Sequence, residues 1–307
     1  MARRGVVMAA ALLVAQAAGA QQAPLFPPIT GLWLLPGTHQ GAALPYGPSS
    51  PDADWMVGQW DIPANLPAFS GNSTSNQFAS VTLGAQNSFA LAQDATTLPC
   101  DRLYGSGRTM VNEYDLLVSS MPIPLLSALA DPAARVRPRL PLDTISHVMV
   151  SGTVHVDRMR EADHACKATQ GVVGIGVVLT NLTSRQTLYY QVSFTVYRDP
   201  GTGFVATAAP ANWFFRGNNV QNGDARQFGY GDRAWASYGM APLHEGQSES
   251  FNIDVLPVLK QLFVEEAADG IDQNLDDWAV TGGYFGESAF GHVQVGSSWT
   301  HVDMSEN

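Results

Sequence analysis

The sequence has few charged residues and lacks the short motifs of the common nucleotide- and metal-dependent enzymes. Charged residues make up 14% of its 307 residues, whereas glycine and proline number 29 and 19. That composition is typical of many short strands and turns rather than of long surface helices. Gly-x-x-x-x-Gly-Lys, Gly-x-Gly-x-x-Gly before a helix and His-Glu-x-x-His are all absent. The absences argue against P-loop, Rossmann and zinc-peptidase enzymes, and we expect no cofactor.

Basic residues are also scarce, so the formal net charge is −11. A nucleic acid or an anionic membrane surface requires a basic face that neutralises its phosphates. We therefore expect neither as a partner.

The first twenty residues have the pattern of an export signal. Arg3 and Arg4 precede an apolar run over 6–14, and the segment ends in small residues at 18–20. The run is too short for a transmembrane helix, which needs about 20 apolar residues. We expect a signal peptide over 1–20, no membrane anchor, and a secreted or periplasmic protein.

The two cysteines, Cys100 and Cys166, are predicted to form a disulfide, because paired cysteines oxidise outside the cytoplasm. Metal binding with the nearby His164 is the alternative, but the Cys-x-x-Cys spacing of zinc sites is missing. His155 and Asp157 would share one face of a strand, where solvated polar residues are expected. No metal site is predicted.

A Pro- and Gly-rich stretch over 21–53 is predicted to be an irregular leader, followed by a single domain over 54–307. Alternating apolar and polar residues then indicate a series of strands, with a hairpin connection at 181–186. The predicted strands cover 55–62, 78–83, 88–93, 110–118, 144–156, 172–180, 187–197, 203–208, 278–285 and 291–302.

One segment has helical periodicity, with apolar residues at positions 255, 256, 259, 262 and 263. Asp254 is a suitable N-cap, and Gly270 a suitable stop. Many strands with one late helix predict an all-β fold, an antiparallel β-sandwich or jelly roll with a short packed helix near the C-terminus.

Glu287 is the most interesting single carboxylate. Glycines and aromatic residues flank it over 282–291, so a ligand could approach, and burial beside apolar rings raises a carboxyl pKa towards that of a general acid. The alternative is a structural glutamate at the tip of the closing hairpin. The residues alone leave both interpretations open.

The stretch 251–304 resembles the end of the family-12 endoglucanases, which are concanavalin-like jelly rolls. The helix over 254–268, then Gly286-Glu287-Ser288-Ala289-Phe290-Gly291, Val293, Val295 and Trp299 follow in the order of that family's final strands. The resemblance implies that Glu287 is the catalytic acid/base.

The same family carries a nucleophilic glutamate in a Tyr-Glu-x-Met-x-Trp pattern, and the matching stretch here is Tyr190-Gln191-Val192-Ser193-Phe194. Gln191 therefore occupies the nucleophile position. Retaining hydrolysis needs two carboxyls about 5 Å apart. Either the correspondence is displaced, or Glu113 or Asp115 is the second acid, or the fold persists without hydrolysis.

A second resemblance is to the glutamic peptidases, β-sandwiches that pair a Gln with a Glu. It is carried by Trp60-Asp61-Ile62-Pro63, Gln93 and the 181–183 hairpin. The later Trp-x-x-Glu pattern of those enzymes falls at 213–216, where Arg216 replaces the acid. A glutamic-peptidase-like hydrolase is therefore the third hypothesis.

Aromatic side chains are candidates for stacking on sugar rings, because their flat apolar faces suit carbohydrate. We expect a carbohydrate-active protein, with possible hydrolysis of a β-glucan-type polysaccharide. The alternative is a non-catalytic extracellular binding or structural protein, which Gln191 favours. The candidate substrate-binding residues are Trp60, Trp213, Trp235, Tyr238 and Tyr284.

Overall fold

The computed structural model describes most of the chain after its first 22 residues. The predicted signal peptide lies outside the described residues. The described ranges are 23–26, 28–29, 32–34, 44–46, 55–85, 87–103, 109–120, 140–166, 169–184, 186–198, 205–206, 213–219, 223–230, 238–265, 267 and 270–307.

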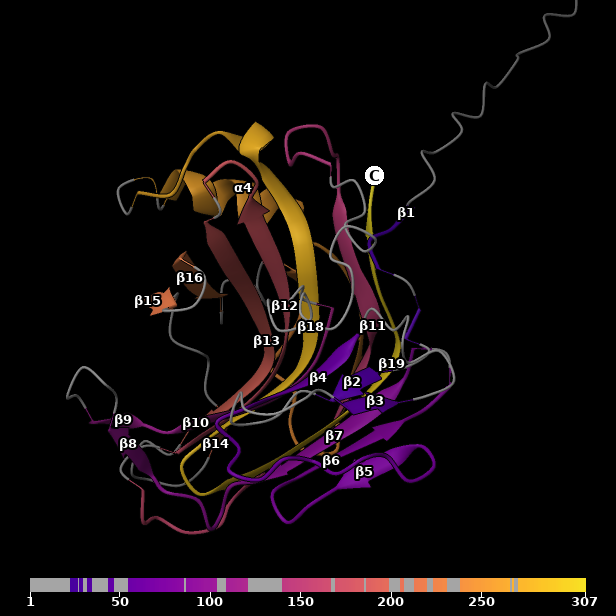
Figure 1. Cartoon of the computed structure of the whole chain (residues 1–307), viewed down its shortest axis with the longest axis vertical. Helices are drawn as coiled ribbons and strands as arrows, with labels where there is room; N and C mark the ends of the chain where they lie inside the picture. The colour runs from indigo at the N-terminus through magenta and orange to yellow at the C-terminus, as the bar shows by residue number, and fades with distance from the viewer. Residues whose placement is uncertain are drawn as a thin grey trace, which may run out of the picture.

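Strands dominate these ranges (Figure 1). They are β1 (Ala23–Pro24), β2 (Leu32–Leu34), β3 (Leu44–Tyr46), β4 (Met56–Trp60), β5 (Ser73–Ser75), β6 (Ala79–Leu83), β7 (Phe89–Asp94), β8 (Asp101–Leu103), β9 (Thr109–Val111), β10 (Glu113–Ser119), β11 (Val148–Glu161), β12 (Gln170–Asn181), β13 (Thr187–Arg198), β14 (Val205–Ala206), β15 (Trp213–Asn219), β16 (Gly223–Tyr230), β17 (Ser248–Asp254), β18 (Trp278–Phe290) and β19 (Val293–Glu306). The helix α4 (Leu256–Glu265) and the 3-10 turn η3 (Leu275–Asp277) lie between β17 and β18.

Two sheets form the sandwich. The seven-stranded sheet has the order β17-β11-β19-β7-β6-β5, with β1 added beside β19. The ten-stranded sheet has the order β15-β16-β13-β12-β18-β10-β4-β2-β3, with β14 beside β13. Most pairs are antiparallel, and the pairs β13–β16 and β2–β4 are parallel. The predicted jelly-roll type of sandwich is confirmed.

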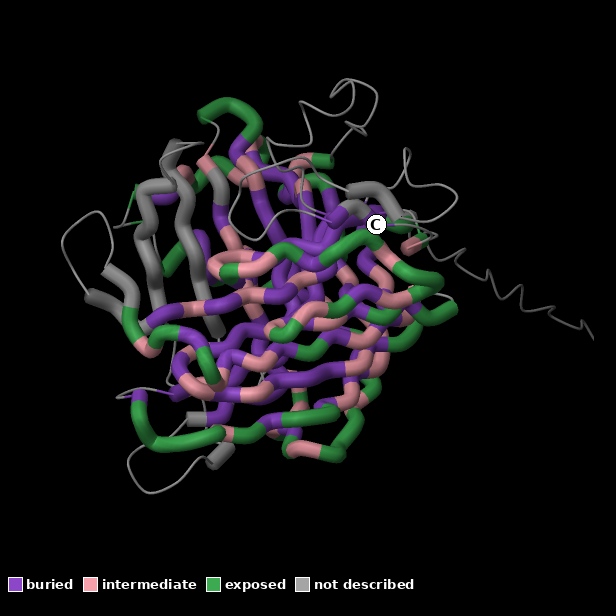
Figure 2. The backbone as a smooth tube through the Cα atoms, turned by 60° about the horizontal axis from the view of Figure 1, so that its bottom comes forward, coloured by how far each residue is buried: buried purple, intermediate pink, exposed green. Residues whose placement is uncertain are grey.

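Alternation along the strands divides each sheet into an inner and an outer face, and buried residues alternate with more accessible ones along the tube (Figure 2). In β10 the side chains of Tyr114, Leu116 and Val118 are buried in the core. The intervening residues, Glu113, Asp115 and Leu117, are half-buried on the other face. This division decides which polar residues can meet a ligand.

Aromatic rings fill the space between the sheets, where Phe285 of β18 lies 5.6 Å from Trp299 of β19, measured between ring centroids. The helix α4 buries its apolar stripe, and Phe263 packs edge-on against Trp278 at 5.0 Å. Asp254 accepts a hydrogen bond from the Leu256 N–H at 3.1 Å. The predicted helix is therefore present.

Several predictions about the elements need correction. Three short strands (β1, β2 and β3) lie in the stretch that was predicted to be an irregular leader, so parts of it join the sheets. The sequence pattern also missed β5, β8, β15, β16 and β17. The hairpin at 181–186 is confirmed, because β12 and β13 pair up to Thr180 and Thr187.

Cys100 and Cys166 form the predicted disulfide. Within the described residues, no helix is both long and apolar enough to cross a membrane.

Candidate functional site

A small hollow with two acidic side chains lies on the outer face of the ten-stranded sheet. We call it the acidic hollow, and its cavity volume is about 80 Å³. It crosses β10, β18, β12 and β13 near the middle of the sheet. Its lining consists of Glu113, Asp115, Leu117, Val172, Gly174, Gln191, Tyr284, Gly286, Glu287 and Ser288.

Strand alternation and register place the two acids in the hollow. Glu113 and Asp115 are two residues apart in β10, so their side chains leave the same face of the sheet. Asp115 pairs with Ser288 of β18 on one side and with Trp60 of β4 on the other. The Ser288 hydroxyl donates a hydrogen bond to the Asp115 carboxylate.

The surroundings of the two acids raise both pKa values, to different degrees. Burial, followed by the negative charges of Asp115 and Asp61, raises the pKa of Glu113 well above its usual range. Burial also raises the pKa of Asp115, helped by the charge of Asp61, but the hydrogen bond from Ser288 opposes the shift and the pKa is about 6. The surroundings therefore favour the protonated form of Glu113 more strongly than that of Asp115.

Glycines let two aromatic rings lie against the sheet beside the acids. A Cβ atom on Gly58 would overlap the Trp60 ring, and one on Gly176 would overlap the Tyr284 ring. Trp60 and Tyr284 belong to one apolar cluster, which also contains Tyr189, Leu117 and Val178. The outer face thus combines carboxyls with aromatic surface.

Gln191 also reaches the hollow. Its Oε1 accepts a hydrogen bond from the Tyr284 hydroxyl at 3.3 Å. The structure therefore brings Gln191 together with Glu113, Asp115 and Tyr284, four of the residues that the sequence singled out.

The Glu287 carboxyl is not part of this group. Glu287 borders the hollow along β18, but its side chain is 1% exposed and lies between the sheets. Its Oε2 accepts a hydrogen bond from the Oγ of Ser297 in β19 at 2.8 Å, and the Trp299 indole N–H donates to the same Oγ at 3.0 Å. Burial raises the pKa of Glu287 to about 8, against the lowering effect of the Ser297 hydrogen bond.

The sequence allowed two interpretations of Glu287, an acid that a ligand can approach and a structural glutamate at the hairpin tip, and the observed position differs from both. The residue lies inside strand β18 and not at the hairpin tip, where Gly291 adopts a φ of 68°. The residues of β18 that share the face of Asp115 are Tyr284, Gly286 and Ser288.

Gln93, the glutamine of the glutamic-peptidase resemblance, lies in the interior and is 4% exposed. Its side-chain amide donates a hydrogen bond to the backbone carbonyl of Glu287 at 3.2 Å.

The other predicted stacking residues are Tyr238, Trp213 and Trp235. Tyr238 packs against the core, and its hydroxyl lies 3.1 Å from that of Tyr190. Trp213 lies in β15, and Trp235 lies outside the described residues.

The sequence pattern missed Ser288 and Asp61. Both act on the electrostatics of the pair, Ser288 through a hydrogen bond and Asp61 through its charge. Ser288 could have been found from its parity with Tyr284 along β18. Asp61 follows the end of β4 and has a φ of 58°, so strand alternation gives no signal for it.

No family model matches the sequence, and no curated protein matches it. Solved structures do match. A native family 12 xyloglucanase from Bacillus licheniformis has a TM-score of 0.43 and 7% identity, over 81% of this chain and 100% of that chain. The family 11 xylanase from Neocallimastix patriciarum has a TM-score of 0.42 and 11% identity, over 82% and 100%. The family 12 endoglucanase 3 from Trichoderma harzianum has a TM-score of 0.38 and 11% identity, over 82% and 98%. Family-12 enzymes are thus among the structural neighbours, as the sequence resemblance implied, and the function has to be argued from the acidic hollow itself.

Proposed function

We propose that the chain is an exported glycoside hydrolase that acts on a β-glucan-type polysaccharide in the acidic hollow. Glu113 is the general acid and Asp115 the general base. One observation carries the proposal: two carboxyls share one outer strand face, and their surroundings raise their pKa values to different degrees. Environments that separate the pKa values of two acids assign one to each role.

The assignment follows from the neighbours of each acid. Burial and the negative charges of Asp115 and Asp61 all raise the pKa of Glu113 and nothing opposes them, so Glu113 is the acid that holds its proton more tightly and can protonate a leaving oxygen. Asp115 accepts the Ser288 hydrogen bond and ionises at about pH 6, so it can accept a proton from water. The pair titrates as a unit, and activity should fall as the pH drops below about 6, where Asp115 gains a proton.

The residue in the nucleophile position favours inversion at the anomeric carbon. Retaining glycosidases form a covalent intermediate on a carboxylate, whereas inverting glycosidases activate a water between the two carboxyls. Gln191 occupies the nucleophile position that the resemblance implies. An amide cannot form the covalent intermediate of retention.

Trp60 supplies most of the aromatic surface for contact with sugar, because it is half-buried whereas Tyr284 is only 6% exposed. Both rings lie beside the acids over glycines, and a sugar ring can stack there while its hydroxyls meet polar side chains. The hollow itself is much smaller than a drug-sized pocket of about 300–1,000 Å³. The polysaccharide would therefore lie along the sheet and insert one linkage at the acids.

Hydrolysis and its stereochemistry test the proposal together. The mature chain is incubated with neutral β-glucans and xylan, new reducing ends are counted, and proton NMR records the anomer that forms first. We expect cleavage with inversion, hence an α-anomer from a β-linkage. Cleavage with retention would refute the roles of Glu113 and Asp115, but the proposal that the chain is a glycoside hydrolase would stand.

A non-catalytic polysaccharide-binding protein is the second candidate, and Gln191 is the observation that favours it. It predicts binding of the same glucans, measured by calorimetry, without any new reducing ends. That outcome would replace the hydrolase proposal.

A further inference from the structure

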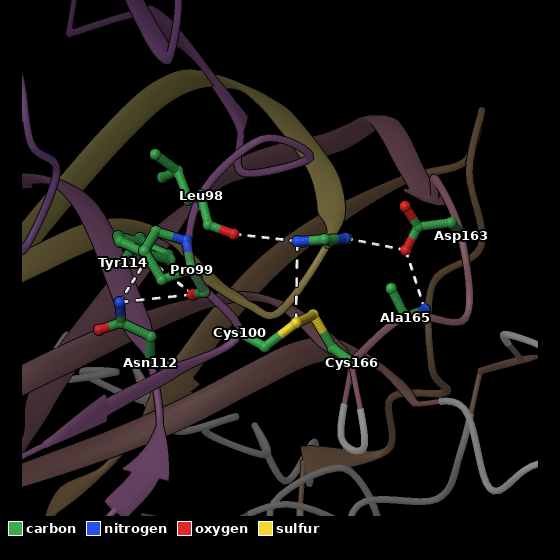
Figure 3. Close-up of a disulfide and its surroundings, with 9 residues drawn as sticks. Leu98, Pro99, Cys100, Asn112, Tyr114, Asp163, Ala165 and Cys166 are labelled. Carbon is green, nitrogen blue, oxygen red and sulfur yellow. Dashed lines mark hydrogen bonds and ion pairs between the residues drawn. A yellow bond between two sulfur atoms is a disulfide. The ribbon is translucent and has the colours of Figure 1, made fainter.

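The disulfide lies at a junction of three chain segments (Figure 3). Cys100 precedes β8, and Cys166 lies in the connection between β11 and β12, 66 residues further along. Their Cα atoms are 5.3 Å apart. The third segment is the β18–β19 turn, which contributes His292.

His292 lies against the disulfide. Its Nε2 is 3.7 Å from the Cys100 Sγ and 2.9 Å from the Leu98 carbonyl oxygen. Its Nδ1 is 2.8 Å from a carboxylate oxygen of Asp163. The two sulfurs and a ring nitrogen all lie within 4.8 Å of one another. His164, the neighbour of Cys166 considered from sequence, instead pairs with Glu161 at 3.2 Å.

These three side chains have the donor set of a zinc site. Zn²⁺ binds thiolate sulfur at about 2.3 Å and imidazole nitrogen at about 2.0 Å in a tetrahedron. A tetrahedral edge between such ligands is about 3.6 Å long by the same bond lengths, close to the 3.7 Å that separates Nε2 from Sγ. The contact between His292 and Asp163 also supports a metal site, because a histidine that binds a metal usually donates its other N–H to a carboxylate.

We propose that the reduced chain binds Zn²⁺ through Cys100, Cys166 and His292, with Asp163 orienting the imidazole and water as the fourth ligand. A thiol or phosphine reductant supplies two electrons, and two protons are taken up as the disulfide becomes two thiols. Binding of Zn²⁺ then releases both thiol protons. His292 Nε2 gives up to solvent the proton that it directs at the Leu98 carbonyl and then binds the metal, while Nδ1–H donates to Asp163. A disulfide oxidant such as oxidised glutathione takes up two electrons from the thiolates, which re-forms the Cys100–Cys166 bond and expels the ion.

The site would hold the three segments together before the disulfide forms. The ligands come from chain positions 100, 166 and 292, which only the folded sandwich brings together. Metal binding therefore reports on a folded, reduced state. The proposal is independent of the hydrolase activity.

Cobalt spectroscopy tests the site. The mature chain is reduced with a phosphine, desalted without oxygen and titrated with Co²⁺, while far-UV circular dichroism monitors the fold. We expect a sulfur-to-cobalt charge-transfer band and tetrahedral d–d bands that saturate at one ion per chain and that Zn²⁺ abolishes. The oxidised chain should show neither band. Absence of the bands in the reduced chain, folded or unfolded, overturns the proposal.

Two histidine variants separate this site from adventitious thiol binding. His292→Gln should weaken Co²⁺ binding by at least tenfold, whereas His164→Gln, a neighbour of Cys166 in sequence, should leave it unchanged. Asp163→Asn should weaken binding about 10- to 100-fold, as loss of an orienting carboxylate does. Equal affinities of the His292 and His164 variants would exclude His292 as a ligand.

Discussion

The two faces of the ten-stranded sheet place acidic side chains in opposite environments. Glu287 on the inner face and Asp115 on the outer face each accept a hydrogen bond from a serine, Ser297 and Ser288 respectively. Glu287 is sealed between the sheets with a pKa of about 8, and Asp115 borders a hollow with a pKa of about 6. Burial raises both values, but only the outer acid can meet a substrate.

The difference shows that side-chain parity along a strand, more than residue type, decides which acid borders the hollow. Ser288 and Glu287 are adjacent in β18, yet one side chain faces the hollow and the other the core. A carboxyl with a raised pKa in a glycine-rich strand looks like a catalytic acid in both places. The comparison predicts separate consequences for the two faces.

The largest expected effect is on kcat, which should fall when the outer acid is substituted but not when the inner acid is. Asp115→Asn removes the proposed base and should lower kcat by about a thousandfold, within the usual range of about 10²–10⁴ for acid–base catalysis. Glu287→Gln keeps an acceptor for Ser297 and should change kcat by less than about threefold by the same reasoning. Reducing-end release at saturating glucan measures both. A loss in the Glu287 variant as large as that in the Asp115 variant would return the acid/base role to Glu287.

The second effect concerns stability. The folded-state pKa of Glu287, about 8, lies above its ordinary value of 4.5, so the folded protein binds this proton more tightly than the unfolded chain. The stability it contributes is complete below about pH 4.5 and is lost as the pH rises to about 8, at about 1.4 kcal/mol per pH unit. Glu287→Gln removes the titration, so its advantage over wild type should grow by roughly 2–3 kcal/mol between about pH 6 and 8. Urea unfolding at both pH values measures it. Parallel pH profiles for the two proteins would show that Glu287 is ionised in the folded state.

The sequence indicated the sandwich, the helix and the disulfide because each depends on local pattern or on residue chemistry. Alternation in β11 and the apolar stripe of α4 are local, and two cysteines allow one pairing. The site was harder to predict from the sequence. Glu113, Asp115, Gln191, Trp60 and Tyr284 were all singled out, but nothing local showed that β10, β18, β12 and β13 meet at one hollow. The burial of Glu287 could not be predicted, because the resemblance fixes an order of residues along the chain and does not fix which face of β18 each side chain takes.

The smallest expected effect compares two glycines, one for each face. A methyl group on Gly176 would overlap the Tyr284 ring on the outer face, whereas one on Gly283 would overlap the Met304 side chain in the interior. Gly176→Ala should displace the ring from the hollow and weaken glucan binding by about tenfold, a loss of about 1.4 kcal/mol typical of a stacking contact. Gly283→Ala should cost about 1–3 kcal/mol of stability through overpacking and leave the affinity unchanged. Calorimetric titration and thermal unfolding of both variants measure the two quantities. If Gly283→Ala weakened binding as much as Gly176→Ala, the two faces would be coupled, and the interior could no longer be treated as a passive support for the hollow.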